Sequence, residues 1–176
     1  YDAFYTPPEI AEQVIGLAGI RPQTLVLEPS VGTGALAIPA AEAGGIVVTY
    51  ELRKDIWTPP APTDGSRPRI VLEDGTDFLA VDPEDNEGRR VEPLYDRVVM
   101  NPPFSNQQDM AHVRHAARFL RSGGRLVAVM SPAFTFRTSR VAVEFRTWLD
   151  GLDHDIVELP AGSFKISGTG VHTIIL

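Results

Sequence analysis

The chain has 176 residues, of which 43% are hydrophobic and none is cysteine, which predicts one domain with a full core and excludes disulfides, thiolate metal sites and a cysteine nucleophile. The formal net charge of −7 argues against a protein whose whole surface binds nucleic acid, because Lys and Arg supply most phosphate contacts. No apolar run approaches the roughly 18 residues of a membrane span, and the first residues have no pattern of a secretory signal. The lack of cysteine fits a cytoplasmic protein.

Short apolar runs alternate with helical stretches, which is typical of an α/β fold with mostly parallel strands. In chain order, we expect strands at residues 24–28, 46–51, 69–72, 96–100, 125–130, 156–159 and 172–176. Helices are expected at residues 8–18, 34–43, 107–121 and 139–152. The last two strands have no helix between them, so they should form an antiparallel hairpin at one edge of the sheet. The segments 58–69 and 82–93 have the proline and charge content of surface loops.

The first expected strand continues into a glycine loop, LEPSVGTGAL. Gly32 and Gly34 allow the backbone to turn tightly and to approach a ligand at a helix N-terminus. With Ala37, the loop satisfies the G-x-G-x-x-A pattern of dinucleotide-binding folds, and Glu51 closes the second strand as a ribose-binding acid would. A phosphate cradle without chemistry is therefore one possible function.

The acid ahead of the glycines favours a different ligand. The negative charge of Glu28 would disfavour a pyrophosphate and favour a group that carries an ammonium or a sulfonium. S-adenosyl-L-methionine (AdoMet) carries both. Glu51 would then accept hydrogen bonds from the ribose hydroxyls, Asp77 would accept one from the adenine amine, and the Phe78 ring would pack on the adenine face. The structural alternatives are a loop cap for Glu28 and a helix N-cap for Asp77.

The stretch RVVMNPPFSN ends a buried strand at a stiff corner. Pro102 and Pro103 have no backbone N–H, so strand pairing must stop, and Asn101 is held extended because it precedes a proline. The corner offers backbone carbonyls, one amide side chain and the ring of Phe104. It fits a planar group that presents two hydrogens.

Six motifs occur in the order seen in the DNA adenine-N6 methyltransferases, which this chain resembles over nearly its whole length. They are YTPPEIA, LEPSVGTGAL, an acid ending the second strand, DF after the third, NPPF after the fourth, and FKISGTGVHT between the last two. The resemblance implies a class I methyltransferase (Rossmann-like) fold, a three-layer sandwich with a mostly parallel seven-stranded sheet in the order 3-2-1-4-5-7-6 and strand 7 antiparallel. It also implies AdoMet as cofactor and methylation of the exocyclic amino nitrogen of adenine in DNA, with the base flipped out of the duplex.

The same resemblance assigns roles to the corner residues. The Asn101 side-chain oxygen and the Pro102 carbonyl would accept the two amino hydrogens, in a corner completed by Pro103. Phe104 would stack on the flipped base. The residues expected to bind the cofactor are Tyr5, Thr6, Pro7, Glu28, Pro29, Ser30, Gly32, Gly34, Glu51, Asp77, Phe78 and Asn101.

Two further residues are implied to contact the substrate. Phe164 would form the second face around the base, or else be a core residue of the hairpin, and Lys165 would lie near the substrate backbone. The target-recognition domain that such enzymes usually carry after the last strand is not seen in residues 1–176. We therefore expect DNA binding to need a further domain or a partner subunit.

Other functions stay open at this point. The same corner suits enzymes that methylate a protein glutamine amide or a guanine amine in ribosomal RNA, and a non-catalytic subunit that keeps the fold is a third alternative. Arginines 114, 118, 121, 125, 137, 140 and 146 either contact nucleic acid or cover two solvated helix faces. His112 and His115 are interpreted as surface residues, and we expect no metal site.

Overall fold

The computed structural model describes residues 5–62, 69–85, 87–92, 94–160, 162–164 and 173–176. Its strands form a seven-stranded sheet in the order β3-β2-β1-β4-β5-β7-β6. They are β1 (Leu25–Glu28), β2 (Ile46–Glu51), β3 (Ile70–Asp74), β4 (Tyr95–Met100), β5 (Leu120–Met130), β6 (Val157–Glu158) and β7 (Ile174–Ile175). β7 runs antiparallel to both of its neighbours and the other pairs are parallel. The predicted strand order and the predicted edge hairpin are therefore confirmed.

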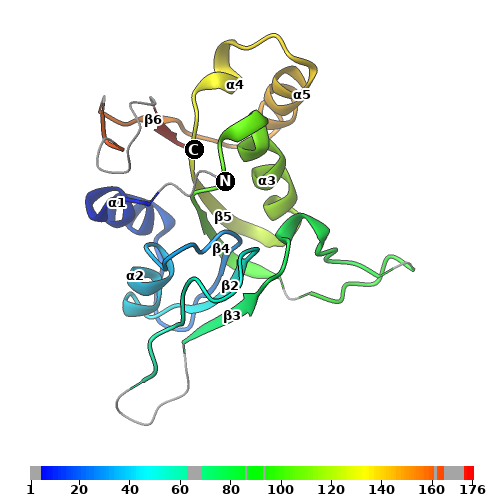
Figure 1. Cartoon of the computed structure of the whole chain (residues 1–176). Helices are drawn as coiled ribbons and strands as arrows, with labels where there is room; N and C mark the ends of the chain where they lie inside the picture. The colour runs from blue at the N-terminus through cyan, green and yellow to red at the C-terminus, as the bar shows by residue number, and fades with distance from the viewer. Residues whose placement is uncertain (1–4, 63–68, 86, 93, 161, 165–172) are drawn as a thin grey trace.

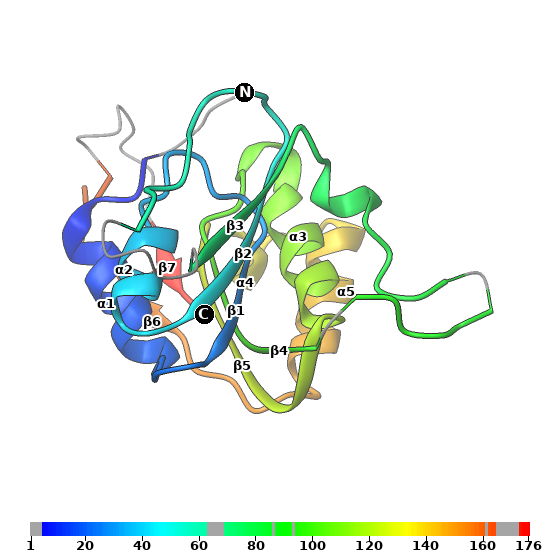
Figure 2. The same ribbon diagram turned by 90° about the horizontal axis from the view of Figure 1, so that it is seen from below.

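Helices cover both faces of the sheet and make a three-layer sandwich. They are α1 (Pro8–Ala18), α2 (Ala37–Glu42), α3 (Gln108–Ala117), α4 (Ala133–Phe136) and α5 (Arg140–Leu149), with short 3-10 helices η1 (Phe78–Ala80) and η2 (Ser105–Gln107). Figures 1 and 2 show α1 and α2 on one face and α3 and α5 on the other. No helix among the residues described is long and apolar enough to cross a membrane.

Side chains alternate across the central strands, so that each face of the sheet has its own core. Val26 and Val99 belong to the cluster under α1 and α2. Leu27 and Val98, one position along, belong to the cluster under α3 and α5. These buried strands hold the loops at their carboxyl ends in fixed positions.

Local signals set several element boundaries as predicted. α1 begins at Pro8, whose missing N–H costs nothing in a first turn, and ends at Gly19, which adopts the left-handed conformation with φ of 60°. Several other boundaries differ from the predicted ones, and α3 ends at Ala117 and not at residue 121. α2 begins at Ala37 and not at residue 34, because the glycine loop makes a turn first, with the Gly34 N–H donating to the Val31 carbonyl at 2.9 Å.

β5 and α4 also differ from the sequence prediction. β5 begins at Leu120, where it already pairs with Tyr95, and an irregularity in the register separates this pair from the next. α4 is a single turn that the sequence did not predict. The described residues of the predicted loop, 82–85 and 87–92, project from the body of the molecule (Figure 2), and Glu84 and Arg90 form an isolated bridge there.

Candidate active site

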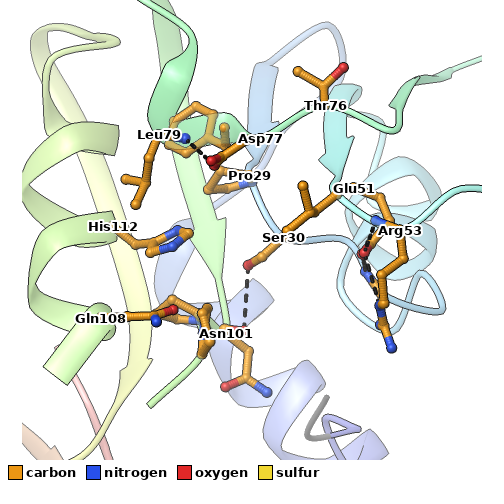
Figure 3. Close-up of a pocket in the computed structure, with 15 residues that line it drawn as sticks. Pro29, Ser30, Glu51, Arg53, Thr76, Asp77, Leu79, Asn101, Gln108 and His112 are labelled. Carbon is orange, nitrogen blue, oxygen red and sulfur yellow. Dashed lines mark hydrogen bonds and ion pairs between the residues drawn. The ribbon is translucent and has the colours of Figure 1, made fainter. Parts of the chain in front are cut away.

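A cavity of about 360 Å³ lies at the carboxyl ends of the central strands, beside the boundary between β1 and β4. In open α/β sheets this boundary, where the strand order reverses, is the usual place for a ligand. Figure 3 shows the loops after β1, β2, β3 and β4 and one side of α3 around the cavity. The predicted site residues that line it are Pro29, Ser30, Gly32, Glu51, Asp77, Phe78, Asn101, Pro102 and Pro103.

A smaller hollow of about 100 Å³ adjoins this cavity. The two share Ser30, Gly32, Arg53 and Asn101. The predicted residues that line only the smaller hollow are Tyr5, Thr6 and Glu28. The N-terminal segment and the glycine loop thus meet at one end of the site, as the sequence predicted.

Glu28 is the most unusual group in the smaller hollow. Its side chain is 2% exposed, and its Oε2 atom has no hydrogen-bond partner among the described residues. Burial raises the pKa of this carboxyl well above its ordinary value; the Ala37 backbone N–H opposes the rise, and the charge of Glu51 adds to it. A buried carboxylate without a partner is stabilised by a cationic ligand. The site therefore has a place for one positive charge.

This burial also changes the argument against a dinucleotide. A carboxyl whose pKa is raised carries its negative charge over a narrower range of pH, so it repels a pyrophosphate less than an exposed carboxylate would. The glycine loop supplies a separate argument. A Cβ atom at Gly34 would lie 2.3 Å from the Trp57 indole, so the close approach that this glycine allows is to a side chain of the protein. The Gly32 N–H already donates to Glu51 Oε2 at 3.0 Å.

Glu51 is buried at the end of β2, and both of its oxygens have partners. Oε1 accepts from the Arg53 backbone N–H at 3.0 Å and from its Nε at 3.2 Å. Among the described residues, Oε2 accepts only from the Gly32 N–H, so it is the oxygen with more capacity for a further donor such as a hydroxyl. The sequence did not single out Arg53, whose guanidinium borders both cavities.

The Asn101 corner is held from two directions. Its Nδ2 donates to Thr6 Oγ1 at 2.9 Å, and its backbone carbonyl accepts from Ser30 Oγ at 3.4 Å. Thr6 is buried just ahead of α1. Because the amide nitrogen donates to Thr6, the amide has one defined orientation, in which Oδ1 is the acceptor atom. Pro102 and Pro103 follow at the wall of the larger cavity.

Asp77 and Phe78 lie at the opposite end of the larger cavity. Asp77 is the N-cap of η1, with Oδ1 accepting from the Leu79 N–H at 3.0 Å. This confirms the N-cap reading, and the carboxylate is exposed where it lines the cavity. The Phe78 ring is buried against Tyr50 and Phe119, at centroid distances of 5.3 and 5.1 Å. It therefore forms part of the core as well as the cavity wall.

The prediction that His112 is a surface residue is wrong. Its side chain is 9% exposed and lines the cavity together with Gln108, one turn earlier on α3. Burial lowers the pKa of His112; the charge of Asp77 opposes this change and that of His115 adds to it. His115 is half-buried, with Nε2 at 2.9 Å from the Val81 carbonyl. The four-residue spacing of Gln108 and His112 predicts that both lie on one face of the helix, but it does not indicate which way that face points.

Neither of the two predicted base-stacking rings is among the residues that line the hollows. Phe104 is half-buried and packs against the cluster under α1 and α2, to which Phe164 belongs. Phe164 is 1% exposed, so stacking on a base would require this ring to leave the cluster. Pro7 is buried just before α1. Lys165 and most of the FKISGTGVHT segment lie outside the described residues.

Several arginines of the second half of the chain pair with the fold itself. Arg118 pairs with Asp82 at 2.9 Å, Arg121 with Asp96 at 2.7 Å, and Arg140 with Glu144 at 2.6 Å. Arg125 donates to the carbonyl of Leu17. These contacts favour a structural role for the arginines, although Arg121 and Arg125 lie on β5 and not on a helix as expected. Within the described part of the chain, no group of three or more His, Asp or Glu could hold a metal ion.

The sheet order, the antiparallel seventh strand and the position of the cavity define the class I methyltransferase fold. Residues 74–147, less than half of the chain, match the model of the family described as "Methyltransferase small domain". This match includes Asp77 and the NPPF corner. A comparison with curated proteins finds no match.

Solved structures give the same fold. The chain is similar to a type I restriction-modification system methyltransferase subunit from Streptococcus thermophilus, with 20% identity, a TM-score of 0.78, and coverage of 98% of this chain and 44% of that one. It is also similar to a modification subunit of a putative type I restriction enzyme from Vibrio vulnificus, with 17% identity and a TM-score of 0.70. The match covers 98% of this chain and 43% of that one. A third similar structure is magnesium protoporphyrin IX methyltransferase from Synechocystis, with AdoMet bound, at 15% identity and a TM-score of 0.66. That match covers 96% of this chain and 77% of the other. The chain spans less than half the length of the first two proteins. AdoMet is the cofactor that the fold and the family model indicate.

Proposed function

We propose that this chain binds AdoMet and transfers its methyl group to the exocyclic amino nitrogen of adenine in DNA. The observation that carries the proposal is the position of Asn101. Its amide is oriented by Thr6 at 2.9 Å, at the point where the larger cavity meets the smaller hollow that contains Glu28. A fixed acceptor for an amino group therefore lies beside a place for a cation.

The residues around both hollows fit AdoMet. Glu28 Oε2, buried and without a partner among the described residues, suits the positively charged end of the cofactor. Glu51 Oε2 retains capacity for a ribose hydroxyl. Asp77 exposes a carboxylate that can accept from the adenine amine. When bound, AdoMet supplies a methyl group on a sulfonium.

The corner residues act on the amino group of the substrate. Asn101 Oδ1 and the Pro102 carbonyl each accept one of its hydrogens, which draws the nitrogen lone pair out of conjugation with the ring. The amino nitrogen would take the methyl group that AdoMet supplies, with S-adenosylhomocysteine as the leaving group, and would release one proton to water. Fixed acceptors placed where positive charge develops stabilise the transition state without reorganisation. Orientation by Thr6 and Ser30 keeps the acceptors in place.

Adenine in DNA is proposed as the substrate on two grounds. YTPPEIA and NPPF match the adenine-N6 enzymes in sequence, and the structure joins these motifs through the contact between Thr6 and Asn101. Phe104 is partly exposed beside the corner and offers a ring for stacking. Because several arginines are already paired within the fold, we propose that much of the DNA contact comes from a further domain or a partner subunit. The two restriction-modification subunits of similar fold make such a system a suitable setting.

The proposal is tested with labelled AdoMet and separate pools of DNA, ribosomal RNA and protein. The intact protein should label DNA. Label in protein or ribosomal RNA alone would instead support a glutamine amide or a guanine amine, which present the same planar amino group. No label in any pool, with AdoMet still bound, would support the non-catalytic alternative. The Asn101→Ala variant is the control, since it removes an acceptor and leaves Glu28 in place.

A further inference from the structure

His112 is a buried polar residue of the cavity to which the proposed reaction gives no role. It projects from α3, and Figure 3 shows its ring directed into the cavity on the side of Leu79 and Asp77. Its Nδ1 atom is inaccessible to solvent and has no hydrogen-bond partner among the described residues. The side chain is more than nine-tenths buried. The missing partner at Nδ1 decides which ring nitrogen carries the proton, because a buried N–H without an acceptor costs more than an acceptor without a donor.

The protonation state of the ring follows from its surroundings. Burial lowers the pKa of His112, and the charged and titratable groups that act on it are Asp77 on η1 and His115 on α3. The imidazole is therefore neutral near pH 7, with one donor nitrogen and one acceptor. A buried N–H without an acceptor would carry the full cost of desolvation, so we assign the proton to Nε2. The ring then presents a donor to the cavity.

A donor at His112 and an acceptor at Asp77 make a complementary pair. Adenine offers the matching donor and acceptor, because its amino group donates and the neighbouring ring nitrogen on either side, N1 or N7, accepts. Hypoxanthine and guanine present a carbonyl at the amino position, which would face the Asp77 carboxylate unfavourably. The pair thus discriminates between purines.

We propose that His112 binds the cofactor by donating a hydrogen bond from Nε2 to a ring nitrogen of its adenine, while Asp77 accepts from the adenine amine. This inference rests on the proposed function, because it takes the nucleoside of AdoMet as the occupant of the larger cavity. It adds a specificity-determining residue that the sequence motifs do not contain. His112 lies within the residues that match the family model, yet outside the NPPF corner and the DF pair.

The test is a set of binding measurements with S-adenosylhomocysteine, which cannot be turned over, and its 7-deaza and 1-deaza analogues. Calorimetry on the intact wild-type protein should show that one of the two analogues binds about two- to tenfold more weakly than the parent. The His112→Leu variant should lose this difference. His112→Gln, whose amide N–H extends to a similar reach, should retain part of it. His154→Leu removes an exposed histidine that does not line the cavity, and it should behave as wild type.

The outcomes separate the two proposals. If the wild-type protein does not bind S-adenosylhomocysteine, both the proposed function and the role of His112 are overturned. If it binds the parent and both deaza analogues equally, only the role of His112 is overturned. Thermal unfolding of each variant shows whether it is folded. Should His112→Leu fail to fold, wild-type discrimination together with its partial retention in His112→Gln supports the assignment, and equal binding by wild type rejects it.

Discussion

Replacing Glu28 by Gln should raise the stability of the protein and weaken its binding of AdoMet. Burial raises the pKa of Glu28 well above the ordinary 4.5. Because the folded-state pKa lies above the unfolded one, the proton contributes stability that is fully present below about pH 4.5 and is lost as pH rises through the folded pKa. Glu28→Gln is neutral throughout. The cofactor-free variant should therefore be more stable than wild type at pH 8.

The magnitude follows from the single proton involved. One such group changes the free energy of unfolding by at most about 1.4 kcal/mol per pH unit, which corresponds to roughly 3–6 °C in Tm for a domain of this size. Urea unfolding at a series of pH values should show that Glu28→Gln removes a slope of this size above pH 4.5. The exposed Glu9→Gln is the matched control and should keep the wild-type slope.

Cofactor binding should change in the opposite direction. Losing a charged partner costs about 1.5–3 kcal/mol, so AdoMet should bind Glu28→Gln about 10- to 150-fold more weakly in calorimetry at pH 8. Wild-type affinity should rise with pH, because the cation favours the ionised carboxylate. An unchanged pH slope in the variant would refute the account of burial, and unchanged affinity would refute the role in binding a cation.

Three further substitutions test other contacts. Thr6→Val should lower the rate of methyl transfer by up to about 100-fold, because the amide of Asn101 loses its orientation, and Thr6→Ser should retain activity. Equal transfer rates for these two variants would contradict this role of Thr6. Gly34→Ala should destabilise the fold by at least about 2 kcal/mol in urea unfolding, through backbone strain and collision with an indole. Gly123→Ala shares the positive φ but meets open space, so an equal loss there would rule out the collision. Phe104→Ala should weaken DNA binding by about 1–3 kcal/mol in a filter-binding assay, and an unchanged Kd would remove the stacking role.

The features that could be predicted from the sequence are those set by local chemistry. Two prolines must end a strand, so the corner after β4 was predicted in its place. Alternation of apolar runs with helices gave the α/β class, and motif order gave the strand order. The shared carboxyl edge of parallel strands then brought Glu51, Asp77 and Asn101 to one cavity.

The features that were missed depend on contacts between distant parts of the chain. Nothing around Gly34 indicates that the Trp57 indole packs against it. The burial of His112 depends on which face of α3 packs against the sheet. The spacing of His112 and His115 in the sequence does not indicate that face. Phe78 was expected to pack on the adenine of the ligand, and its burial in the core beside Tyr50 and Phe119 was not predicted. Each of these details requires tertiary packing.

The central claim, methyl transfer to adenine in DNA by the Asn101 corner, is tested most directly by analysis of the product. DNA incubated with AdoMet and the intact protein is digested to nucleosides, which are identified by mass spectrometry. The account predicts N6-methyladenine with the wild-type protein and none above background with Asn101→Ala, while calorimetry shows that both bind AdoMet. N6-methyladenine formed equally by both proteins, or a methyl group on another base, would contradict it.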